Sequence, residues 1–167
     1  LGVEPTYWDS HQHVAFLPGL VRPVCAAAED AGMRRARTPR VWVVSTDHAH
    51  HWAQARWRLA RPRRFAGDGY RSLVAARLRR RFATPSWQVA PELVIGDGLS
   101  PERRWDAILG SLPVGVTEAV THPGHVDGGL AGVSAHFVEA REDDLAALTR
   151  LGAAGVQLTR FRDLDPV

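Results

Sequence analysis

Short apolar runs alternate with segments of helical character along most of the chain. The runs Val41 to Val44, Glu92 to Ile95 and Val114 to Thr121 are rich in β-branched and other apolar residues, as buried strands are. This alternation predicts an α/β domain with largely parallel strands, because two parallel strands need a crossover between them, usually a helix. In such domains the reactive side chains gather at the carboxyl ends of the strands.

Capping residues indicate where two of the helices lie. Val24 to Ala31 contains good helix formers and is followed by Gly32, a residue type that often ends a helix. Ser100 and Pro101 suit the start of a second helix, with Trp105 on its core face. Leu73, Val74, Leu78 and Phe82 are expected to share a core face. The other predicted elements are the end of a strand over 6–11, helices over 50–60, 70–82 and 141–151, a turn over 67–69 and a last strand over 156–159.

The composition restricts the class of protein. With 167 residues, 45% of them hydrophobic and 23% charged, residues 1–167 suit a single globular domain and not a disordered tail. No run approaches the roughly 20 apolar residues that a membrane-spanning helix needs, and no secretory leader opens the sequence. We therefore expect a cytoplasmic protein with no membrane partner. The single cysteine, Cys25, excludes an internal disulfide and a multi-cysteine metal site.

The positive charge comes from arginine alone. All 21 basic residues are Arg, and the formal net charge is +3. Such a composition reflects GC-rich codons as much as selection for phosphate binding, and helical spacing spreads the arginines over solvated faces. We therefore expect no nucleic-acid partner. A nucleic-acid-binding protein would instead bind DNA or RNA with a steep salt dependence.

Asp9, His11 and His13 form the first candidate site. They are spaced two residues apart, and on an extended backbone this spacing directs all three side chains to one side. Carboxylate and imidazole groups supply the oxygen and nitrogen donors that a divalent cation accepts. Two interpretations stay open: a metal site at the end of a strand, and a polar loop whose histidines hydrogen-bond locally.

His122 is the second candidate. It follows a predicted strand, and Pro123 and Gly124 turn the chain directly after it. A histidine can transfer protons near neutral pH, as a general acid for a leaving amine must, and the alternative is a histidine that only satisfies the turn. A further stretch contains Asp47, His48, His50 and His51. There a solvated helix start is favoured over a metal site.

Several motifs together resemble one known family. Pro5-Thr6-Tyr7-Trp8-Asp9-Ser10-His11-Gln12-His13-Val14, followed by Leu17-Pro18-Gly19, is similar to a stretch of the YdjC-like carbohydrate deacetylases, which include chito-oligosaccharide deacetylases. Arg37-Thr38-Pro39, His122-Pro123 and Phe161-Arg162-Asp163 follow in the family's order. By this resemblance the fold is an irregular (β/α) TIM-like barrel. The chain would correspond to the C-terminal two-thirds of that barrel, with the N-terminal strands missing.

The resemblance also implies an activity and a set of site residues. The activity is removal of the N-acetyl group from an N-acetylated amino sugar or chito-oligosaccharide, with a divalent cation, Mg²⁺ or Zn²⁺. His11 and His13 would be metal ligands, His122 and Asp9 catalytic residues, and Arg37 a substrate contact. The oligomeric state stays open, with a homodimer as one alternative.

The chain departs from the family pattern in two respects. Tyr7 and Ala15 stand where the family has histidines, and the family's N-terminal Asp-Asp-x-Gly motif and a further metal-binding histidine are not found. With the probable base carboxylate absent, we expect little activity from this chain alone. The alternatives are an amidohydrolase-like metal hydrolase and a degenerate carbohydrate-binding or partner-dependent domain. Trp42 is a candidate for stacking on a sugar ring, although tryptophan more often packs in a core.

Overall fold

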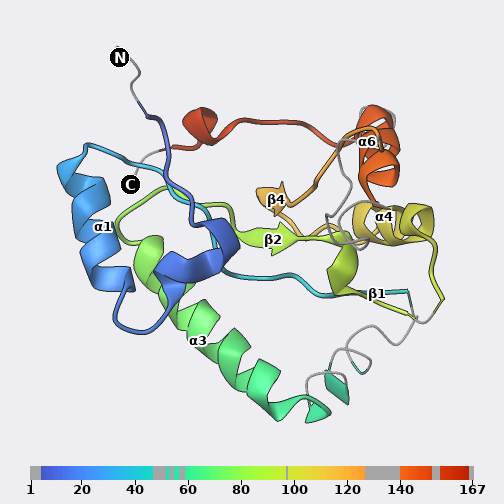
Figure 1. Ribbon diagram of the computed structural model, residues 1–167, viewed down its shortest axis with the longest axis horizontal. Coiled ribbons are helices and arrows are strands. Elements are labelled where there is room, and N and C mark those ends of the chain that lie inside the picture. The colour runs from blue at the N-terminus through green and yellow to red at the C-terminus, as the bar shows by residue number, and fades with distance from the viewer. Residues whose placement is uncertain are drawn as a thin grey trace.

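A computed structural model describes residues 5–46, 52, 55–56, 59–96, 98–126, 140–151 and 155–165, without the side chains of His11, Gln12 and Arg64. Figure 1 shows the arrangement of the elements, with α1 and α3 on one side of the strands and α4 and α6 on the other. The elements are, in chain order, η1 (His11–Phe16), α1 (Val21–Asp30), β1 (Val44–Ser45), α3 (Pro62–Leu78), β2 (Trp87–Val89), η2 (Pro91–Leu93), β3 (Val94–Ile95), α4 (Pro101–Leu109), β4 (Thr117–Ala119), α6 (Arg141–Arg150) and η4 (Phe161–Asp163).

The strands are short and parallel. β1 pairs with β3, and β2 pairs with β4, so that the structure contains two small two-stranded sheets. Isolated parallel bridges connect further extended segments: Trp8 with Ala36, Arg35 with Ala83, and Val41 with Gln88. Each extended segment therefore lies beside the next one along the chain, which confirms the α/β prediction. No closed barrel is formed within the described ranges.

Two apolar clusters hold the elements together. The first joins α1, α3 and the N-terminal segment, and its members are Trp8, Phe16, Val21, Cys25, Ala28, Ala36, Val74, Leu78 and Phe82. The second joins the strands to α4 and α6, and its members are Val44, Val89, Val94, Trp105, Ile108 and Ala147. The C-terminal segment returns to the N-terminal one, because Tyr7 stacks on Phe161 with ring centroids 4.2 Å apart. Burial of these apolar side chains is the main stabilising contribution to the fold.

Local signals located several helix ends correctly. The Ser100 side chain accepts a hydrogen bond from the backbone N–H of Arg103 and caps α4, as its position before Pro101 predicts. Gly32 follows α1 with φ of +75°, a left-handed conformation that glycine adopts without strain. The predicted helix over 141–151 is α6. Within the described part of the chain, no helix has the length and apolar composition needed to cross a membrane.

Three local predictions were wrong, and one strand was not predicted. The turn over 67–69 is absent, because α3 continues through it and Val74 and Leu78 anchor the helix in the first cluster. Leu73 is 65% exposed and not part of the core face. β2 was missed, and the described residues 155–165 form no strand where one was expected over 156–159. The predicted helix over 50–60 lies mostly outside the described residues, as does the stretch from Asp47 to His51.

Candidate functional site

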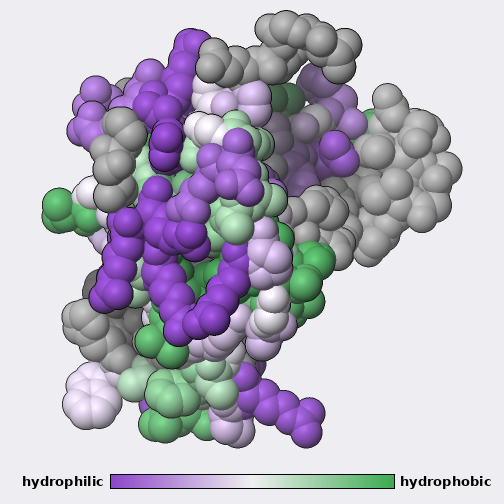
Figure 2. All heavy atoms as spheres, turned by 90° about the vertical axis from the view of Figure 1, so that its left-hand side faces the viewer, coloured by the Kyte–Doolittle hydropathy of each residue, from purple (hydrophilic) through white to green (hydrophobic). Residues whose placement is uncertain are grey.

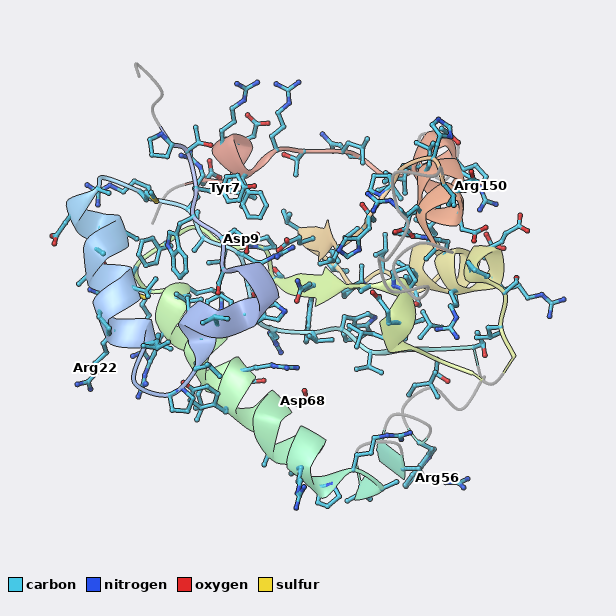
Figure 3. All side chains as sticks on the ribbon, viewed as in Figure 1. Tyr7, Asp9, Arg22, Arg56, Asp68 and Arg150 are labelled. Carbon is cyan, nitrogen blue, oxygen red and sulfur yellow. The ribbon has the colours of Figure 1, made fainter. Side chains whose placement is uncertain are left out.

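Arg37 joins two carboxylates that lie far apart in the sequence. Its Nε donates a hydrogen bond to Oε1 of Glu118 at 2.5 Å, and its Nη1 donates to both oxygens of Asp9 at 3.1 and 3.0 Å. Asp9 and Arg37 each directly follow one member of the Trp8–Ala36 bridge, and Glu118 lies in β4. Neighbouring parallel segments thus bring together one guanidinium and two carboxylates, which we call the Asp9–Arg37–Glu118 cluster. In Figure 3, Asp9 lies between η1 and β4.

Glu118 is the more buried of the two acidic residues in this cluster. Its side chain is 10% exposed, against 40% for Asp9. Burial raises the pKa of the Glu118 carboxyl, whereas the charge and hydrogen bond of Arg37 oppose that rise. Its second oxygen, Oε2, is buried and has no hydrogen-bond partner among the described residues. Glu118 therefore has one oxygen that Arg37 fixes and one buried oxygen without a hydrogen-bond partner in the described part of the chain.

His13 lies next to the cluster in a strained conformation. The Ser10 hydroxyl accepts a hydrogen bond from the backbone N–H of Ala15 at 2.7 Å, and the Ser10 carbonyl accepts one from the backbone N–H of His13 at 2.9 Å. These bonds hold the tight turn of η1, in which His13 has φ of +60°. The Nδ1 atom of His13 is buried without a partner in the described part of the chain. Burial, Arg71 and Arg37 lower its pKa, so the ring is mainly neutral at pH 7.

The geometry assumed for Asp9, His11 and His13 was wrong. The prediction needed an extended backbone, but residues from His11 onward form the 3₁₀ helix η1. Side chains in a 3₁₀ helix follow a period of three, so a spacing of two does not align them. Asp9 precedes η1 and reaches Arg37, and electrostatic effects of Asp9 and Arg37 on His13 place the three in one neighbourhood. The His11 side chain lies outside the description, and its role as a metal ligand stays a prediction.

His122 is held by a carboxylate of α6. Asp144, which is 4% exposed, accepts a hydrogen bond from the backbone N–H of His122 at 2.8 Å and another from Nε1 of Trp105 at 3.0 Å. Asp144 thus fixes the chain just beyond β4, four residues after Glu118. The catalytic role of His122 stays a prediction, and the structure adds the residue that positions its backbone.

Trp42 packs in the core. Its Nε1 donates to the carbonyl of Ser111 at 3.2 Å, and its ring meets Trp87 edge-on with centroids 4.9 Å apart. The ring is packed against the second apolar cluster. Stacking of Trp42 on a sugar ring is untested and receives no support from this position.

A hollow of about 240 Å³ lies between α3 and the strands. Arg40 covers the Trp87 ring at 3.6 Å, and both residues line the hollow. Asp68 lines it from α3, where Figure 3 labels it. Arg71 lines this hollow and also lowers the pKa of His13, so this wall of the hollow lies toward the neighbourhood of His13. The further lining residues are Val41, Phe65, Gly69 and Ser72.

The described side chains do not by themselves fit a metal ion. Among them there is no group of three or more His, Cys, Asp or Glu residues that could hold one. Both oxygens of Asp9 are bound to Arg37, whose guanidinium supplies the positive charge between the two carboxylates. A cation would need further donors, such as His11.

The sequence analysis missed Glu118 and Asp144. A charged residue within the strand Val114 to Thr121 was the available signal for Glu118, because an unpaired acid is rarely buried. The signal for Asp144 is weaker, since acidic residues are common in the first turn of a helix, where they stabilise the helix dipole. In both cases the partner that explains the burial lies on another element.

Comparison with known proteins gives one match. Residues 1–154 match the family described as YdjC-like protein. No curated protein and no solved structure matches the chain. The matched range contains the Asp9–Arg37–Glu118 cluster together with His13, His122 and Asp144. Since it spans most of the 167 residues, this chain belongs to the YdjC-like protein family.

Proposed function

We propose that this chain removes the N-acetyl group from an N-acetylated amino sugar or chito-oligosaccharide by hydrolysis. Membership of the YdjC-like family indicates a hydrolase of the carbohydrate deacetylase type. The observation that carries the proposal is the Asp9–Arg37–Glu118 cluster, in which Arg37 fixes one oxygen of Glu118 and the buried Oε2 has no partner in the described residues. The order of parallel neighbouring segments supports the further proposal that the domain belongs to an irregular (β/α) barrel.

Amide hydrolysis needs a group that takes a proton from water and one that gives a proton to the departing amine. Glu118 suits the first role, because Arg37 fixes one of its oxygens and opposes the rise in its pKa that burial causes. His122 suits the second role, since it comes three residues after the end of β4, the strand that carries Glu118, and Asp144 holds its backbone. Each role is typically worth about 10² to 10⁴ in rate.

The sugar would bind in the hollow beside α3. Its volume of about 240 Å³ is below the roughly 300 to 1,000 Å³ of drug-sized pockets, so it suits one sugar ring. Phe65 supplies an apolar face, and Asp68 and Arg71 supply polar groups for hydroxyls. Arg71 then connects the bound ring to the neighbourhood of His13.

The divalent cation implied by the family resemblance is a separate question. We retain His11 and His13 as its proposed ligands, and the test is the metal content of the purified protein with His11→Ala as the variant. Loss of bound Mg²⁺ or Zn²⁺ in that variant is expected. Equal metal content in both proteins would remove His11 from the ligand set.

Acetate release from diacetylchitobiose tests the activity. We expect Glu118→Gln to lower kcat by about 10² or more, because the amide cannot accept a proton. Glu102→Gln is the matched control, since Glu102 is 67% exposed and pairs with Arg150 on another face. Undiminished turnover in Glu118→Gln would exclude Glu118 as the base. Binding of the sugar by the wild-type protein without any acetate release would favour the carbohydrate-binding alternative.

A further inference from the structure

A second hollow lies beside the first apolar cluster, between α1 and the C-terminal end of α3. Its volume is about 230 Å³, and its lining consists of Val21, Arg22, Cys25, Arg77, Arg80 and Arg81. Figure 2 faces this side of the molecule and shows hydrophilic side chains around a small hydrophobic area. None of the lining residues belongs to the Asp9–Arg37–Glu118 cluster or to the hollow beside it. We propose that this arginine-ringed hollow binds a phosphate monoester.

The ring carries positive charge that the described part of the chain does not neutralise. Arg81 forms an ion pair with Glu29, whose carboxylate accepts hydrogen bonds from both Nε and Nη2 of Arg81. Arg22, Arg77 and Arg80 form no ion pair with any described residue. Three arginines without an ion pair in the described part of the chain thus line one hollow, and an anion bound there would reduce the repulsion between their charges.

The dipole of α3 explains only part of this arrangement. Arg77 lies in the last turn of α3, and Arg80 follows the helix, where cations are favoured by the helix dipole. Arg22 comes from another element and lies in the first turn of α1, where the dipole disfavours a cation. That first turn contains no acidic residue, and no side chain caps it. The N-terminus of a helix, where backbone N–H groups lack partners within the helix, favours an anion.

The chemistry of the lining selects the ligand class. Arginine binds phosphate through paired N–H groups, and a dianion offsets more of the charge than a carboxylate does. Val21 and Cys25 add an apolar floor that inorganic phosphate would not use but that the carbon stem of a monoester would cover. The small volume restricts that stem to a short chain or a single ring.

Calorimetric titration with phenyl phosphate and inorganic phosphate, at constant ionic strength, tests the proposal. We expect phenyl phosphate to bind more tightly than inorganic phosphate, and both more tightly than acetate. Arg22→Gln and Arg80→Gln should each weaken phenyl phosphate about tenfold or more, as loss of a charge-assisted contact does. Arg103→Gln, on the exposed face of α4, is the matched control and should bind as the wild type does.

Thermal unfolding of the same variants is a second measurement, in which the effect of the substitution should change sign when ligand is added. Without ligand, Arg80→Gln should unfold at a higher temperature than the wild type, because repulsion within the ring is reduced. With phenyl phosphate present, the order should reverse. Equal affinities of the wild type and the three variants, or no phosphate binding by the wild type, would overturn the proposed site. Equal affinity for phenyl phosphate and inorganic phosphate would overturn the assignment of a monoester as the ligand. Acetate release reports separately on the proposed deacetylase activity, since no ring residue contributes to it.

Discussion

Replacing Arg37 by Met should destabilise the protein strongly. The side chains of Arg37 and Glu118 are 16% and 10% exposed, so their ion pair is largely removed from water. Removing one partner of a buried pair typically costs about 3–5 kcal/mol, because the other charge is left uncompensated. The contact with Asp9 adds at most about 1 kcal/mol, since that carboxylate is 40% exposed. The total is a large part of the roughly 5–15 kcal/mol by which domains are stable.

The loss should depend on pH in a defined direction. Burial already raises the pKa of Glu118 above its ordinary value of 4.5, and Arg37 opposes this shift. Without Arg37 the folded-state pKa rises further. A carboxyl with a raised pKa stabilises the fold in its protonated form, a contribution fully present below the unfolded pKa and lost as pH rises through the folded pKa. The destabilisation of Arg37→Met should therefore be smaller near pH 5 than near pH 7.5.

Urea unfolding at these two pH values measures the effect. The double variant Arg37→Met with Glu118→Leu should recover most of the loss, because replacing both partners of a buried pair by apolar residues is often close to neutral. Arg150→Met is the control, since its contacts with Glu102 and Asp106 are exposed and should cost less than about 1 kcal/mol. Equal losses for Arg37→Met and Arg150→Met, or no recovery in the double variant, would refute the argument.

Substitutions at three further positions test other parts of the structure. Asp144→Ala should cost about 2–4 kcal/mol in urea unfolding, since it leaves the N–H groups of Trp105 and His122 without their acceptor, and it should lower kcat with little change in KM. His13→Gly should be more stable than His13→Ala by about 1 kcal/mol, because glycine adopts the φ of +60° without strain. Both variants should lose turnover. Equal stability of the two variants would argue against strain at this position. Ser100→Ala should cost about 1 kcal/mol through loss of the α4 cap and leave kcat unchanged.

The fold class was predictable because it depends on a repeated local pattern. Apolar runs and caps found most elements, but β2 was missed because Gln88 lies at its centre. Gln88 is 3% exposed, and its backbone pairs with both Arg40 and Trp42. Sequence alone gives no reason to bury a glutamine. The wrong turn over 67–69 has the opposite cause, since packing of α3 outweighed the cost of about 1 kcal/mol for each glycine within it.

The candidate site was predictable only where residues are close in sequence. Asp9 and His13 were found from one short motif, although the backbone assumed for them was wrong. Arg37 was found through the family resemblance as a substrate contact, a role that stays untested, and its contacts with two carboxylates were not foreseen. Glu118 was missed because its partner Arg37 lies 81 residues away, and a single glutamate in a strand is normally exposed. Long-range pairs of this kind follow from the topology, which no local pattern contains.

The Asp9–Arg37–Glu118 cluster and His13 together carry energetic costs that a purely structural core would avoid. His13 is the non-glycine residue with positive φ in the described ranges, and its Nδ1 and the Oε2 of Glu118 are both buried without partners there. Each such atom costs about 1–3 kcal/mol, and a core can remove that cost by substituting an apolar residue of similar shape. Strain and unsatisfied groups persist where they serve binding or catalysis. A ligand that donates to Oε2 of Glu118 would remove one of these costs, so binding energy is available at the place where the proposed hydrolysis needs it.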